Sequence, residues 1–326
     1  MTQQDDPAAS REEPQKRAST RRLLFAALGV TAFASLCELA SLKGYFDFRK
    51  LAQPLDRKDA YLQSLAQLAD PEHAAGQIVH VGHSTHLLSV AGVRLLTDPW
   101  FYDPAFGAMS HKRPPAVAPA DIGPLDCILV SHDHADHFDE RAIDQLDKRS
   151  MVLVATDHLA ARAKSMGFES VHVLRPYEEI KVGEATVAAV PGIHDIYEIG
   201  FVIRGAERSV YFAGDTRYQE AFNEIAERYA PQLGILPVDG TRLRGGKLHV
   251  MTPEDAVRAA HVLGVSRVMP THAEAVFSDP LVKHVIASTI ADAPIKFGRL
   301  IAESGAPFKC ELPLPGASFE LPPAPA

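Results

Sequence analysis

Three histidines and two aspartates fall within seven residues of this sequence, in the string Ser131-His132-Asp133-His134-Ala135-Asp136-His137. The string follows Cys127 to Val130, an apolar run typical of a buried strand, so it should form a loop at a strand end. Imidazole and carboxylate groups are ligands that Zn²⁺, Mn²⁺ and Fe share. A solvated polar loop would explain any pair of these residues, whereas the full H-x-H-x-D-H pattern indicates metal binding. We predict that this one loop serves two ions, through the pair His132 and His134 and the pair Asp136 and His137.

Short apolar runs bounded by Gly, Pro and Asp recur from residue 77 onward and predict strands. They cover residues 78–81, 87–90, 93–96, 127–130, 151–155, 171–174, 186–190, 200–203, 209–213, 233–237 and 265–270. Helices are expected between them at residues 157–166, 218–230 and 253–263. The last of these has Thr252 as a natural N-cap and Pro253 at its first position. This interleaving of strands and helices predicts a mixed α/β architecture.

Further histidines and aspartates stand near the ends of the expected strands, in a fixed order around the central string. They are His83, Asp98 in Thr97-Asp98-Pro99, His194, Asp215 in Gly214-Asp215-Thr216, and His272. This order resembles the metallo-β-lactamase superfamily over residues 77 to 300. The resemblance implies an α/β fold, namely an αβ/βα four-layer sandwich with the metal site at one edge of two packed sheets.

The same resemblance implies a ligand set for two divalent metal ions. The first ion would take His132, His134 and His194, and the second would take Asp136, His137 and His272. Asp215 matches the carboxylate that bridges the two ions in this family. Two cations that share a water lower its pKa toward neutrality, which supplies a metal-bridging hydroxide for hydrolysis. Zn²⁺ is the expected metal, although these ligands also suit Mn²⁺ or Fe.

Three segments point to one branch of the superfamily: Leu96 to Phe101, Lys112 to Pro115, and Pro124 to Asp126 ahead of His132. They resemble N-acyl-phosphatidylethanolamine phospholipase D and its bacterial relatives, together with the L-ascorbate-6-phosphate lactonase branch. The resemblance implies a phospholipase D-like metallo-hydrolase of a phosphodiester such as a phospholipid. A lactonase or other ester hydrolase is the alternative within enzymes. A non-catalytic metal-binding module anchored to a membrane is the alternative outside them.

Two histidines outside the ligand set are placed like substrate-contacting residues of that branch. His249 would protonate a leaving oxygen or steady a phosphate, so it joins Asp136 and Asp215 as a candidate catalytic residue; a plain loop histidine fits its position equally. His83 lies in a G-H-S-T arrangement and would contact substrate or orient a ligand, with a cap or core role still open. Asp195 departs from the branch, where an aromatic residue is usual.

The N-terminus has the features of a targeting segment. Residues 1–22 are polar and end in Arg21-Arg22, and residues 23–37 carry no charge. A basic region before an apolar run predicts an export signal or an uncleaved membrane anchor over residues 1–43. A buried first helix of a soluble domain is the alternative. We therefore expect a membrane-associated or exported protein, on the periplasmic side or anchored in the inner membrane of a bacterium, more than a cytoplasmic one.

The rest of the chain divides by composition. We expect a linker with a short helix over residues 44–76, a catalytic domain over 77–311, and a loose proline-rich tail over 312–326. The net charge of −8 and the pI near 6.0 supply no basic field, so a small-molecule or lipid substrate is expected and a nucleic acid is not. The three cysteines are too far apart in sequence for a thiolate metal site. The oligomeric state stays open.

Overall fold

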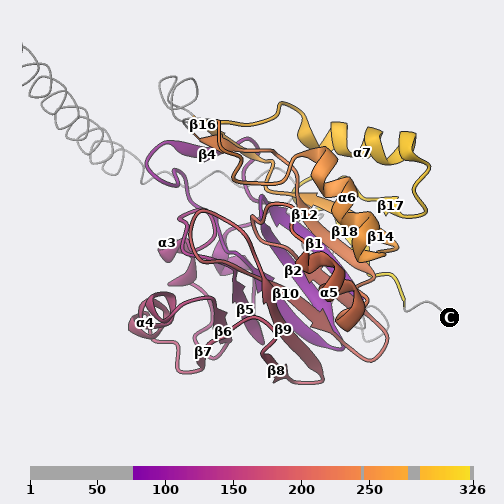
Figure 1. Ribbon diagram of the computed structural model, residues 1–326. Coiled ribbons are helices and arrows are strands. Elements are labelled where there is room, and N and C mark those ends of the chain that lie inside the picture. The colour runs from indigo at the N-terminus through magenta and orange to yellow at the C-terminus, as the bar shows by residue number, and fades with distance from the viewer. Residues whose placement is uncertain (1–75, 244–245, 278–286, 324–326) are drawn as a thin grey trace, which may run out of the picture. The chain divides into compact units, whose positions relative to one another are not determined.

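The computed structural model describes residues 76–243, 246–277 and 287–323, and its core is built from two seven-stranded sheets (Figure 1). In the first sheet, strands at one end pair antiparallel and β3, β5, β6 and β7 pair in parallel. Its strand order is β18 (Ser318–Glu320), β1 (Gly76–Gly82), β2 (Thr85–Val90), β3 (Val93–Thr97), β5 (Cys127–Val130), β6 (Met151–Val154) and β7 (Val171–Val173).

The second sheet mirrors the first, with a parallel half and an antiparallel half. Its strand order is β17 (Lys309–Cys310), β14 (Arg267–Thr271), β12 (Leu233–Pro237), β11 (Ser209–Phe212), β10 (Ile199–Arg204), β9 (Ala185–Pro191) and β8 (Glu179–Val182). Two small ribbons add β4 (Met109–His111) with β15 (Ala275–Phe277), and β13 (Arg242–Leu243) with β16 (Ala287–Ser288).

Helices cover the outer face of each sheet, which gives four layers (Figure 1). The first sheet carries α3 (Glu140–Ile143) and α4 (Asp157–Ser165), and a 3-10 turn spans Pro119–Asp121. The second sheet carries α5 (Ala221–Tyr229), α6 (Pro253–Leu263) and α7 (Ala293–Ser304). The predicted four-layer α/β sandwich is thus confirmed.

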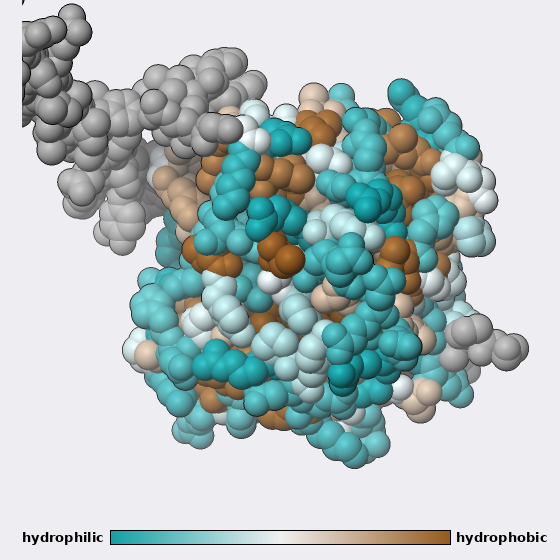
Figure 2. All heavy atoms as spheres, in the orientation of Figure 1, coloured by the Kyte–Doolittle hydropathy of each residue, from teal (hydrophilic) through white to brown (hydrophobic). Residues whose placement is uncertain are grey.

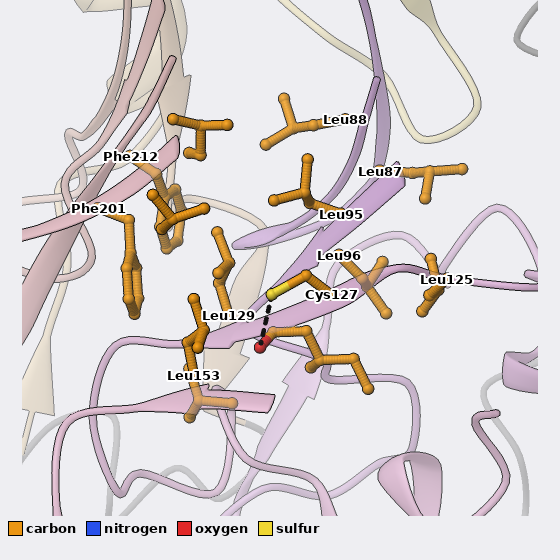
Figure 3. Close-up of a cluster of buried hydrophobic side chains, with 14 of the residues drawn as sticks. Leu87, Leu88, Leu95, Leu96, Leu125, Cys127, Leu129, Leu153, Phe201 and Phe212 are labelled. Carbon is orange, nitrogen blue, oxygen red and sulfur yellow. Dashed lines mark hydrogen bonds between the residues drawn. The ribbon is translucent and has the colours of Figure 1, made fainter. Parts of the chain in front are cut away.

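The main core lies between the two sheets (Figure 3). Leu88, Leu95 and Leu129 of the first sheet face Phe201 and Phe212 of the second, and all five are fully buried. Neighbouring residues of a strand point to opposite faces of the sheet. Each sheet is covered by the other sheet on one face and by helices on the other, so its strands need apolar residues on both faces. Full burial of each such side chain stabilises the fold by about 1.5–3 kcal/mol. This packing fixes the ends of the strands that carry the site.

The structure corrects one expectation about the C-terminus. The tail over residues 312–326 was expected to be loose, but Ser318–Glu320 forms β18 and pairs with β1 through Ile78 and Phe319, and Leu321 is buried beside it. The exposed backbone groups along the edge of β1 offer hydrogen bonds that the tail could not make alone. The catalytic domain therefore extends past residue 311.

The expected targeting segment at residues 1–43, the linker and its helix up to residue 75 lie outside the described residues. Among the helices of the described part, none is long and apolar enough to cross a membrane.

Candidate metal centre

The predicted site residues lie together at one edge of the two sheets. His83 follows β1, the His132 to His137 string follows β5, and His194 follows β9; Asp215 and His272 follow β11 and β14. In the first sheet, β5 runs parallel to β3 and β6, and in the second sheet β12 runs parallel to β11 and β14. The carboxyl ends of these strands therefore meet at a common edge. Side chains as far apart in the sequence as His83 and His272 are thereby brought into contact, with ring centroids 4.4 Å apart.

A first group of donors surrounds His134. Possible ligand atoms of His132, His134, His194 and Asp215 all lie within 4.8 Å of one another. His134 Nδ1 is 2.9 Å from His132 Nε2 and 3.3 Å from His194 Nε2. This is the set that the sequence predicted for the first ion, together with the predicted bridging carboxylate.

A second group surrounds Asp136 and shares Asp215 with the first. His137 Nε2 and His272 Nε2 lie 3.1 Å and 2.8 Å from Asp215 Oδ2, and the same oxygen is 3.8 Å from His132 Nε2. Asp136 Oδ2 is 3.4 Å from His137 Nε2. Asp215 therefore stands between the two groups, as a bridging ligand would.

Some buried carboxylate oxygens in this cluster have no hydrogen-bond partner among the described residues, and they show whether the cluster suits cations. Asp136 Oδ1 and Asp215 Oδ1 are buried and make no hydrogen bond to any described residue. Leaving such groups unpaired costs about 1–3 kcal/mol each, more for charged groups. Divalent cations would complete their coordination, and the donor set of imidazoles and carboxylates is one that Zn²⁺, Mn²⁺ and Fe accept. The residues present thus fit two metal ions.

The electrostatics of the cluster agree with ligand roles. Burial lowers the pKa of His132 well below its usual value, so its imidazole is neutral, as a ligand must be. Burial alone would raise the pKa of Asp136 and Asp215, but His137 beside them holds both pKa values well below the usual range. Burial opposes protonation of His137 and His272, yet Asp215 outweighs it and raises both pKa values. Bound cations would take the place of those protons.

Asp98 positions two of the candidate ligands. Its Oδ2 accepts hydrogen bonds from His137 Nδ1 and Ser131 Oγ, both at 2.6 Å, and its Oδ1 accepts from the Ser131 backbone N–H at 2.7 Å. Ser131 Oγ is in turn 2.9 Å from His132 Nδ1. A carboxylate on the far nitrogen of a ligand histidine fixes its ring and its tautomer. The sequence marked Asp98 as part of a family motif and gave it no role.

Glu198 is a buried residue that sequence reasoning missed. Its Oε1 accepts a hydrogen bond from the backbone N–H of Asp215 and lies 3.4 Å from His132 Nδ1. Burial raises the pKa of the Glu198 carboxyl to about 8. A glutamate directly before the apolar run of β10 was the available signal.

His249 and Asp195 lie next to the first group, and the Asp195 side chain is 28% exposed. The His249 carbonyl accepts a hydrogen bond from His194 Nδ1 at 3.1 Å, and its ring Nδ1 is 3.4 Å from Asp195 Oδ2. Asp195 Oδ1 is 2.8 Å from His194 Nε2 and 4.0 Å from His134 Nε2. The structure therefore places His249 next to the candidate ligands, where a substrate-contacting role stays a prediction.

A second buried histidine network, also missed by sequence reasoning, lies behind His83. Glu274 Oε2 contacts His80 Nε2 at 2.9 Å, and His80 Nδ1 is 3.2 Å from His86 Nδ1. His86 Nε2 lies 3.1 Å from Thr271 Oγ1, next to His272. His80 and His86 lie inside strands β1 and β2, and Glu274 lies between β14 and β15, so the sequence gives no sign that they converge.

Comparison with known proteins gives the family. The family model described as a beta-lactamase superfamily domain matches residues 93–273, more than half of the chain. A UPF0173 metal-dependent hydrolase of Methanopyrus kandleri is 27% identical over 256 residues, which is 75% of this chain and 99% of the relative. One of Rubrobacter xylanophilus is 31% identical over 211 residues, 60% of this chain and 81% of the relative.

Solved structures agree in fold. An isothiocyanate hydrolase from Delia radicum gut bacteria has a TM-score of 0.62 at 21% identity and covers 74% of this chain and 98% of its own. A possible metal-dependent hydrolase from Veillonella parvula has a TM-score of 0.65 at 18% identity, covering 75% and 99%. None of these similarities singles out the phospholipase or the lactonase branch. The matched domain, the relatives' coverage and the two adjoining donor groups together place the chain in the metallo-β-lactamase superfamily, as a member of its UPF0173 metal-dependent hydrolase family.

Proposed function

We propose that this metal-dependent hydrolase cleaves a phosphodiester in a molecule that carries an apolar group, such as a phospholipid. The supporting observation is the distribution of exposed apolar side chains. Hydrophilic residues predominate on the face shown in Figure 2, with apolar residues in separate patches. Seven large hydrophobic side chains are exposed in the described part of the chain, and five of them stand on segments that carry or touch the metal centre: Phe106, Ile193, Ile196, Tyr197 and Val276.

These five residues form what we call the apolar rim. The ring of Phe106 is 54% exposed and its centroid is 5.3 Å from that of His134. Ile193, Ile196 and Tyr197 lie on the segment between β9 and β10 that contains His194. Val276 lies on β15, shortly after His272. Apolar groups exposed around a polar cluster are costly in water and favour a substrate whose apolar portion covers them.

Each part of the cluster has a defined task in this proposal. His132, His134 and His194 would hold one cation and Asp136, His137 and His272 the other, with Asp215 shared. Two such cations lower the pKa of a water they share and neutralise charge on the attacked centre.

The residues around the ligands complete the chemistry. Asp98 and Ser131 fix the rings of the first loop through their outer nitrogens. His249, whose Nδ1 lies 3.4 Å from Asp195 Oδ2, would give a proton to the leaving oxygen.

A carboxylic ester or lactone is the second candidate substrate, and Asp195 favours it. This carboxylate is partly exposed and lies 2.8 Å from His194 Nε2, where the phospholipase pattern has an aromatic residue. A negative charge beside the metal ligands repels an anionic phosphodiester and leaves a neutral ester unaffected. The proposed attachment of residues 1–43 to a membrane would serve either class of apolar substrate.

The test compares substrate classes on the zinc-loaded full chain in detergent micelles. The substrates are bis-p-nitrophenyl phosphate, a phosphatidylethanolamine in mixed micelles, and p-nitrophenyl acetate and decanoate. We expect phosphodiester hydrolysis that is faster on the lipid, that is abolished in His134→Ala, and whose preference for the lipid is reduced in Phe106→Ala. Hydrolysis confined to the carboxylic esters would overturn the proposal in favour of the second candidate. Bound metal with no hydrolysis of any substrate would favour the non-catalytic module.

A further inference from the structure

We infer that His83 is a direct ligand of the second metal ion, in addition to Asp136, His137, His272 and Asp215. This inference rests on the metal centre of the proposed function, but it concerns how an ion is held and makes no assumption about the substrate. The sequence had suggested a role for His83 outside the ligand set.

The distances around Asp136 carry the inference. Asp136 Oδ2 lies 3.4 Å from His83 Nε2, 3.4 Å from His137 Nε2 and 3.5 Å from His272 Nε2. Donors bound to one zinc ion at about 2.0–2.1 Å lie roughly 2.9–3.5 Å from adjacent donors, whether four or five of them surround the ion. His83 therefore has the same spacing to this carboxylate as the two histidines already in the ligand set. Possible ligand atoms of all four residues lie within 4.8 Å of one another.

A hydrogen bond does not account for this spacing. Charge-assisted N–H···O contacts are about 2.7–2.9 Å long, well below the 3.4 Å between His83 Nε2 and Asp136. Neither ring nitrogen of His83 has a hydrogen-bond partner among the described residues, although the side chain is fully buried. A buried imidazole with both nitrogens unpaired is destabilising. A cation between His83 and Asp136 would satisfy Nε2 at the distance seen.

The backbone of His83 is held in place by the segment that carries His272. The His83 N–H donates to Glu274 Oε2 at 3.0 Å, and its carbonyl accepts from Thr271 Oγ1 at 2.8 Å. Both histidines have positive φ, 51° at His83 and 53° at His272, which non-glycine residues adopt only when their surroundings enforce it. Two flanking contacts on one strained residue keep its ring directed at the cluster.

An extra imidazole makes the two metal positions unequal. The second ion would have five protein ligands, whereas the first would have four, counting Asp215 for both. A site with more protein donors holds its ion more tightly, and a site with fewer keeps a position for water or substrate. We therefore expect the second position to fill first and to release its ion last.

The test measures metal binding, so its failure is distinct from a failure of the substrate proposal. Full-length wild type is compared with His83→Asn, because asparagine tolerates positive φ, and with the control His111→Asn. His111 is a buried histidine that stacks on Trp100 and contacts Asp103, outside both donor groups. Zinc affinity is measured by competition with a chelator. The Co²⁺ form is examined by NMR for hyperfine-shifted imidazole N–H signals.

We expect His83→Asn to weaken binding of the tighter zinc ion by more than the roughly 10- to 100-fold that loss of an outer contact costs, and to remove one hyperfine-shifted signal. The His111→Asn control should retain wild-type affinity and all signals. A full set of signals in His83→Asn would overturn the inference. If that variant does not fold, anomalous scattering at the zinc edge from wild-type crystals decides. An ion at about 2.0–2.1 Å from His83 Nε2 supports direct ligation, and one beyond bonding distance refutes it.

Discussion

Replacing Asp98 by asparagine should weaken the second metal position without changing the shape of the site. The Ser131 backbone N–H can only donate, so the amide oxygen of the introduced asparagine must occupy the place of Oδ1, which receives that bond at 2.7 Å. The amide NH₂ then faces His137 Nδ1, where Oδ2 stood at 2.6 Å. Because two donors cannot pair, Nδ1 must become an acceptor and the ring proton moves to Nε2. A protonated Nε2 cannot bind a cation.

The magnitude follows from what such outer contacts contribute. Loss of a partner on a metal-binding histidine lowers metal affinity by roughly 10- to 100-fold, which corresponds to about 1.4–2.8 kcal/mol. Chelator competition on full-length wild type and Asp98→Asn measures the difference directly. The matched control is Asp126→Asn, whose carboxylate accepts from the Arg94 backbone N–H at 2.8 Å at an exposed position outside the donor groups. Equal zinc affinities in wild type and Asp98→Asn would refute the tautomer argument.

Three further substitutions test other parts of the structure. Leu129→Ala opens a cavity between the sheets and should lower the free energy of unfolding in urea titrations by about 2–5 kcal/mol, while two metal ions still bind. An unchanged urea midpoint of unfolding would contradict the described core. Thr252→Ala removes the capping box at the start of α6, in which Thr252 Oγ1 accepts from the Asp255 N–H at 3.2 Å. Thermal unfolding should show a loss of stability of about 1 kcal/mol, and unchanged stability would mean that the cap is dispensable. Asp195→Asn removes the negative charge beside His194 and should raise kcat/KM for bis-p-nitrophenyl phosphate relative to p-nitrophenyl acetate. An unchanged ratio would show that this carboxylate does not select between anionic and neutral substrates.

The positions of most strands and the metal-binding loop from His132 to His137 could be predicted from the sequence, because both leave a local pattern in it. Helix α6 begins and ends where predicted, at Pro253 and Leu263, since its cap and its glycine stop lie next to it in the chain. Strands of two or three residues, such as β17 and β18, carry too short a pattern to stand out. β18 also depends on an edge that another part of the chain provides.

The ligand set was reached from order and resemblance, whereas its supporting residues were not. Glu198 and Glu274 are single acidic residues whose function depends on burial against distant strands. His80 and His86 lie on strands β1 and β2 among mainly apolar residues, so the strand pattern gives no sign of their role. Tertiary packing brings these residues together from distant parts of the chain, and no local pattern in a single sequence predicts such contacts.

The span of the metal centre along the chain also bears on synthesis in the cell. The His132 to His137 loop leaves the ribosome well before His272, which at roughly 5–20 residues per second is a delay on the order of ten seconds. The second donor group is incomplete during that interval because it needs His272, so loading of both ions is a late event that follows the folding of both sheets. Ions that bind only the finished fold add about 2.7 kcal/mol to its stability at a hundredfold excess over Kd. We therefore expect metal shortage during growth to lower the amount of folded protein together with its activity.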